Sequence, residues 1–67
     1  MTYHIHSGNR CVECYSKEMK EKFVREMLED LRTANTPGII RVFSGNQKKR
    51  CEIVQYKEDG SVNVKNN

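Results

Sequence analysis

Residues 17–34, KEMKEKFVREMLEDLRTA, decide the fold because they predict the longest regular element of the chain. With about 100° between successive residues, the apolar side chains fall on one broad face of a helix, and most charged side chains fall on the other. The apolar face consists of Met19, Phe23, Val24, Met27, Leu28, Leu31 and Ala34. The stretch therefore predicts an amphipathic helix whose apolar side packs against a core.

Residues on either side of this stretch indicate where the helix begins and ends. The hydroxyl of Ser16 is placed to accept a backbone N–H of the first turn. Glu18 carries a negative charge where the helix dipole favours one. Asn35 tolerates the left-handed conformation that ends many helices, and Pro37 prevents the helix from continuing. These four residues delimit a helix over 17–34.

Short runs rich in apolar and β-branched residues predict strands on both sides of the helix. Tyr3 and Ile5 share one face of the first strand, and His4 and His6 share the other. The turn residues Ser7-Gly8-Asn9 follow that strand. The predicted strands are Thr2–His6, Ile39–Phe43, Cys51–Tyr56 and Ser61–Lys65.

The last two predicted strands favour a hairpin with a three-residue loop, Glu58-Asp59-Gly60. This loop pairs Tyr56 with Val62 and Val54 with Val64, which brings four apolar side chains onto one face. A two-residue Asp-Gly turn would instead set Val62 beside Lys57. The apolar pattern therefore favours the three-residue loop.

The predicted order is strand-helix-strand-strand-strand within a single domain, residues 1–67. Its simplest arrangement is an α+β fold, a small, mainly antiparallel sheet with one helix packed on one face. The first strand either joins the sheet at an edge or remains a flap.

Two adjacent strands carry apolar residues on both faces, which is more apolar surface than one helix covers. Ile39 and Phe43 oppose Ile40 and Val42 in one strand, and Cys51 and Ile53 oppose Val54 and Tyr56 in the next. Either the N-terminal segment or strand twist covers the second face, or that face binds a partner. If the helix covers the other face, the partner contacts are Ile40, Val42, Val54 and Tyr56.

A cluster of histidines and cysteines near the N-terminus matches the ligand types of a structural zinc site. Cys11 and Cys14 have the spacing of a tight knuckle, and His4 and His6 share a strand face. Together they predict a Cys2His2 site, with Cys51 as a substitute ligand. The alternatives are no cofactor, with reduced cysteines and surface histidines, and thiol chemistry at Cys14, which precedes the helix.

The net charge of +3 comes wholly from residues 35–67, because residues 1–34 carry equal numbers of acidic and basic side chains. Three basic residues in or beside one predicted loop, together with a fourth on a neighbouring strand, suit contacts with phosphate groups. These residues are Arg41, Lys48, Lys49 and Arg50. They define a second possibility, a basic nucleic-acid-binding module.

Several classes of protein fit the sequence poorly. No apolar run approaches the roughly 20 residues that a membrane span needs. The chain also lacks a secretory signal and the even cysteine framework of secreted domains, so we expect a cytoplasmic protein. It has neither a glycine-rich phosphate loop nor a nucleophile elbow, so we do not expect an enzyme.

These features together predict a small, non-enzymatic regulatory or inhibitory module. It docks onto a protein partner, or onto a second copy of itself as a homodimer, through a face or an edge of the sheet. The alternative is the basic nucleic-acid-binding module. A third hypothesis is a version of either module that zinc stabilises through the N-terminal histidine and cysteine cluster.

Overall fold

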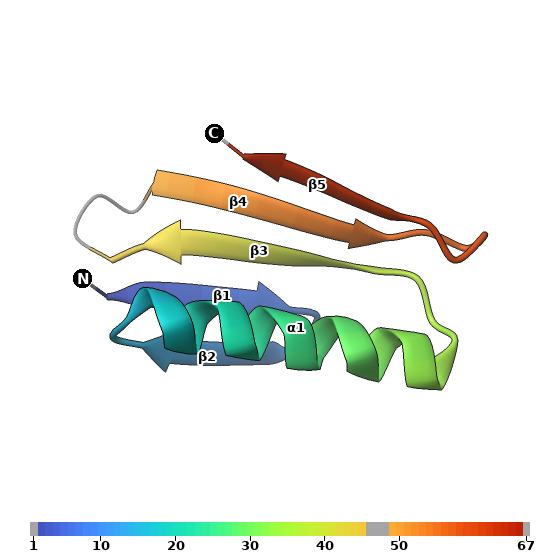
Figure 1. Cartoon of the computed structure of the whole chain (residues 1–67), viewed down its shortest axis with the longest axis horizontal. Coiled ribbons are helices and arrows are strands. Elements are labelled where there is room, and N and C mark those ends of the chain that lie inside the picture. Colours follow the sequence, from blue (N-terminus) through green and yellow to red (C-terminus); the bar gives the residue numbers. More distant parts are fainter. Residues whose placement is uncertain (1, 46–48, 67) are drawn as a thin grey trace.

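The computed structural model describes residues 2–45 and 49–66, which form one helix and five strands (Figure 1). The strand order across the sheet is β2-β1-β3-β4-β5, and every neighbouring pair is antiparallel. The elements are β1 (Tyr3–Ser7), β2 (Arg10–Cys14), α1 (Lys17–Ala34), β3 (Gly38–Ser44), β4 (Lys49–Tyr56) and β5 (Val62–Asn66). The predicted α+β fold, one helix on a mainly antiparallel sheet, is confirmed.

The N-terminal segment differs from the sequence prediction because it forms a hairpin of two strands. Gly8 and Asn9 make a two-residue turn between Ser7 and Arg10. Gly8 has a φ of 61°, as the first central residue of a type II′ turn requires. The residues predicted as a cysteine knuckle are therefore strand β2. The first strand, β1, lies between β2 and β3 and not at an edge.

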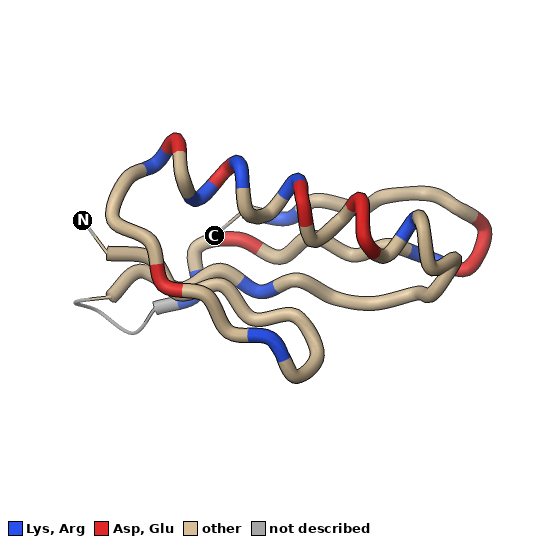
Figure 2. The backbone as a smooth tube through the Cα atoms, turned by 90° about the horizontal axis from the view of Figure 1, so that it is seen from below, with Lys and Arg blue, Asp and Glu red and all other residues tan. Residues whose placement is uncertain are grey.

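The helix α1 has the predicted bounds and the predicted caps. The Oγ of Ser16 accepts the backbone N–H of Met19 at 3.1 Å. Asn35 is left-handed, with a φ of 52°, and its N–H donates to the carbonyl of Arg32 while that of Thr36 donates to Leu31. Acidic and basic residues are interspersed along the helix (Figure 2). Within the described residues, no helix has the apolar length that crossing a membrane requires.

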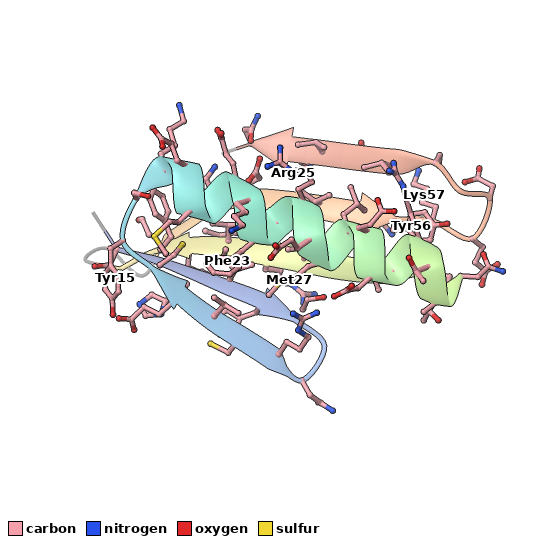
Figure 3. The ribbon with its side chains drawn as sticks, turned by 60° about the horizontal axis from the view of Figure 1, so that its bottom comes forward. Tyr15, Phe23, Arg25, Met27, Tyr56 and Lys57 are labelled. Carbon is pink, nitrogen blue, oxygen red and sulfur yellow. The ribbon has the colours of Figure 1, made fainter. Side chains whose placement is uncertain are left out.

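The core lies between α1 and the face of the sheet that it covers. Phe23 and Met27 project from the helix towards the strands (Figure 3). At one side of this layer, the Nζ of Lys20 lies 3.6 Å from the Oε1 of Glu52, an ion pair that is largely shielded from solvent. The buried cluster consists of Ile5, Cys14, Met27, Ile40, Val42 and Val54.

The C-terminal hairpin has the predicted register, with Tyr56 opposite Val62 and Val54 opposite Val64. Gly60 adopts a φ of 88° in the three-residue loop, a conformation that a side chain would strain. The carboxylate of Asp59 accepts hydrogen bonds from the backbone N–H and the hydroxyl of Ser61, at 2.9 and 2.6 Å. These two hydrogen bonds lower the pKa of Asp59.

A pair of neighbouring isoleucines tests which face α1 covers. Ile40 is fully buried under the helix, so Ile40→Ala should lower the free energy of unfolding by about 2–5 kcal/mol. Ile39 lies on the opposite face and is only half-buried, so Ile39→Ala should cost about 1 kcal/mol. Urea denaturation of both variants measures the difference, and equal losses would contradict this placement of the helix.

Candidate functional site: the open face of the sheet

Successive side chains of each strand point to opposite sides of the sheet, so half of them point away from α1. The strand registers place His4 opposite Phe43, and His6 opposite Arg41. We call this outward side the open face, because no helix of the described residues lies over it (Figure 1). It consists of His4, His6, Cys11, Glu13, Ile39, Arg41, Phe43, Arg50, Ile53, Gln55, Asn63 and Lys65.

The residues expected to contact a partner, if the helix covered the other face, lie in the core instead. Ile40 and Val42 are 0% exposed, Val54 is 3% exposed and Tyr56 is 8% exposed. The helix covers this very face, so the condition on which those contacts depended is not met. The apolar residues that remain half-buried on the open face are Ile39, Phe43 and Ile53.

A bulge in the β3–β4 ladder explains why Cys51 does not follow Ile53 onto the open face. Val42 pairs with Glu52 and Phe43 pairs with Arg50, so Cys51 has no partner on β3. The extra residue changes the alternation of side chains. Cys51 packs against the buried core as a result.

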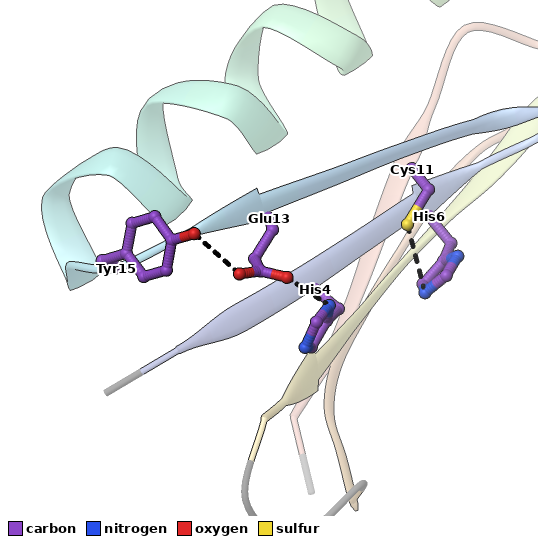
Figure 4. A network of polar contacts seen from close by, with 5 residues as sticks. All are labelled: His4, His6, Cys11, Glu13 and Tyr15. Carbon is purple, nitrogen blue, oxygen red and sulfur yellow. Dashed lines mark hydrogen bonds and ion pairs between the residues drawn. The ribbon is translucent and has the colours of Figure 1, made fainter.

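A polar network runs across the N-terminal hairpin on the open face (Figure 4). The hydroxyl of Tyr15 donates to the Oε1 of Glu13 at 2.7 Å, and the Oε2 of Glu13 lies 3.8 Å from the Nδ1 of His4. The hydrogen bond to Glu13 and the negative charge of its carboxylate raise the pKa of Tyr15. Tyr15 and Glu13 thus hold an acceptor beside one nitrogen of His4.

The side chains of Cys11 and His6 form a contact next to this network. The Sγ of Cys11 is 3.9 Å from the Nε2 of His6, and the His6 ring meets Phe43 edge to face at a centroid distance of 5.4 Å. A hollow of about 380 Å³ opens beside these rings. It is lined by His4, His6, Phe43, Ser44 and Gly45. Two imidazoles therefore border one accessible depression, and the exposed thiol of Cys11 lies next to one of them.

The predicted Cys2His2 set is divided between the two faces. His4, His6 and Cys11 lie on the open face, whereas Cys14 is buried on the side of the helix. The cause is the strand β2, because residues three apart in a strand point in opposite directions. As the side chains stand, no three histidine, cysteine or acidic residues of the described chain are close enough to hold a metal ion.

The basic residues predicted to contact phosphates are only partly visible in the structure. Arg41 and Arg50 lie on the open face, where Lys65 joins them. Lys48 and the side chain of Lys49 lie outside the described residues. Glu13 is the one acidic residue among those described on this face, so the face has a positive balance.

The three cysteines should differ in reactivity, because all are free but they differ in burial. Burial raises the pKa of the Cys14 thiol, an effect that the charge of Lys20 partly offsets, so Cys14 stays protonated at neutral pH. We expect iodoacetamide to alkylate exposed Cys11 first and Cys14 last in the native protein. Mass spectrometry of timed samples measures the order, and a denatured sample serves as the control. Equal native rates at Cys11 and Cys14 would contradict it.

The open face combines half-buried apolar side chains, cations and the polar network of the hairpin. Tyr15 and Glu13 had no recognisable pattern in the sequence, since their contact depends on the turn of the chain from β2 into α1. No protein-family model, curated protein or solved structure matches this chain. The function of the open face is therefore inferred from its own side chains.

Proposed function

We propose that the chain is a small, non-enzymatic binding module that regulates or inhibits a protein partner by docking through the open face. The observation that carries this proposal is a sheet face that no helix of the described residues covers and that bears three half-buried apolar residues, Ile39, Phe43 and Ile53. A sheet with one wet face ordinarily carries polar residues there. Grouped apolar side chains without a covering layer favour an interaction surface.

The charges on the open face favour a partner with acidic groups around an apolar patch. The register sets Ile53 between Arg41 on one side and Lys65 on the other, and Arg50 opposite Phe43. Cations beside an apolar centre steer an acidic surface and fix its orientation. We place this interaction in the cytoplasm, where three free cysteines stay reduced.

The docking proposal is tested by placing a photo-crosslinking amino acid at Gln55 on the open face, and at Val64 on the helix side as the control. Val64 is 53% exposed, so it is accessible without belonging to the open face. The protein captured from Gln55 is then purified and titrated with the wild-type chain. Ile53→Asp should weaken that complex by at least about 2 kcal/mol, as for a central interface residue. Val64→Asp should leave its affinity unchanged.

Two results would contradict docking through the open face. One is equal capture from Gln55 and Val64, and the other is a complex that Ile53→Asp does not weaken. Light scattering separates the case in which the partner is a second copy of the chain, because Ile53→Asp would then convert a dimer into a monomer. Circular dichroism of the variants separates loss of binding from loss of folding.

Nucleic-acid binding is a second candidate, favoured by one specific arrangement. The rings of His6 and Phe43 lie beside Arg41 on the same face, and aromatic rings flanked by arginine can stack unpaired bases. The negative charge of Glu13 and the half-buried isoleucines on the same face favour nucleic-acid binding less than they favour binding to a protein.

Fluorescence anisotropy with a single-stranded oligonucleotide tests this second candidate. Binding should weaken steeply with salt, and Arg41→Ala should lower the salt slope by about 1. Phe43→Leu should cost about 1–3 kcal/mol for each base that stacks on the ring. Lys57→Ala, a change in an exposed residue near the C-terminal turn, is the charge-matched control. Absence of salt-dependent binding would remove the candidate.

A further inference from the structure

We infer that the N-terminal hairpin binds a zinc ion through His4, His6 and Cys11, with the fourth coordination position facing the hollow beside Phe43. This ligand set differs from the one that the sequence predicts, because it excludes Cys14. It is also independent of docking, because the ion would bind the free chain.

The first two ligands already lie at nearly the separation that zinc requires. Cys11 and His6 are direct cross-strand partners, and the Sγ of Cys11 is 3.9 Å from the Nε2 of His6. A tetrahedral ion bound at usual zinc–sulfur and zinc–nitrogen lengths sets these two atoms about 3.6 Å apart. A movement of a few tenths of an ångström therefore brings both atoms to one ion.

His4 is the third ligand because it shares a strand face with His6. Residues two apart in a strand lie on the same side at about 6.5–7 Å along the chain, a span that two imidazole rings can bridge by turning towards each other. The side chain of His4 is 37% exposed, and its contact with Glu13 is a long 3.8 Å. Its ring is therefore able to turn towards Cys11 when an ion enters.

Glu13 and Tyr15 supply the supporting acceptor that the second ring nitrogen of a metal-binding histidine usually has. Histidines that bind metal through one nitrogen generally donate the other N–H to a carboxylate or carbonyl. The Oε2 of Glu13 lies beside the Nδ1 of His4, which leaves its Nε2 for the ion, and the hydroxyl of Tyr15 orients that carboxylate at 2.7 Å. The network in Figure 4 thus has the connectivity of a supported metal ligand.

The other two cysteines are excluded by their positions. Cys14 is buried beneath the helix, and Cys51 packs against the same core. With three ligands on the open face, the ion keeps one position for water or for a group of another molecule, and the hollow lined by His4, His6 and Phe43 gives access to it. Zinc suits this mixture of thiolate and imidazole ligands.

The experiment titrates the purified full chain with Zn²⁺ in competition with a chromophoric chelator. We expect one zinc per chain. Glu13→Gln should lower the affinity about 10–100-fold because it removes the negative charge beside the Nδ1 of His4. His4→Gln, His6→Gln and Cys11→Ser should each lower it further. Cys51→Ser is the matched control and should leave the affinity unchanged.

Co²⁺ serves as a second probe that does not depend on variants. The wild-type chain should show a thiolate-to-cobalt charge-transfer band that Cys11→Ser removes and Cys51→Ser retains. Four results would overturn the site: no competition with the chelator, one zinc per two chains, an affinity that survives Cys11→Ser, or an affinity lost in Cys51→Ser. Circular dichroism of the metal-free variants checks that each has folded.

Discussion

The packing of one helix on one face of a wider sheet is the constraint on which the rest of this structure depends. Met27 and its neighbours on α1 bury Ile5, Ile40 and Val42 completely, and this contact holds the two hairpins in one sheet. The helix packs over β1 to β4, and among the described elements it makes no comparable contact with β5. One face and one margin of the sheet are consequently left without a covering layer from the described helix and strands.

The open face is chemically uneven, and this unevenness separates the two proposals made for it. Its centre, around Phe43 and Ile53, is apolar and flanked by cations. Its margin, on the N-terminal hairpin, carries ligand atoms and the carboxylate of Glu13. His6 belongs to both parts, since its ring contacts Phe43 and its Nε2 faces Cys11. A group docked at the centre would therefore lie next to the hollow and to any ion bound there.

The sequence predicts the local features of this fold well and its long-range choices less well. The caps at Ser16 and Asn35 and the register of the β4–β5 hairpin depend on neighbouring residues, and the structure confirms them. The strand β2 was missed because the Cys-x-x-Cys spacing favoured a loop, although the Gly8-Asn9 turn and the alternation of Val12 with Glu13 favour a strand. Periodicity divides a strand into two faces without saying which one the helix covers. Ile40 and Val42 were therefore predicted as contacts only on the condition that the helix covers the other face, and the structure does not meet that condition. The bulge that diverts Cys51 has no sequence pattern of its own.

The position of β1 in the middle of the sheet has a consequence for how the chain folds. The β1–β2 and β4–β5 ladders join strands that are adjacent in sequence, whereas the β1–β3 ladder joins Ile5 to Val42 across the whole of α1. Closing a long loop costs entropy before its contacts can compensate, and non-local pairing slows folding for this reason. We expect the hairpins and the helix to form early and the β1–β3 ladder to close last. The residues of the β1–β3 ladder, such as Ile5 and Val42, would then determine how fast a newly synthesised chain buries its apolar surface.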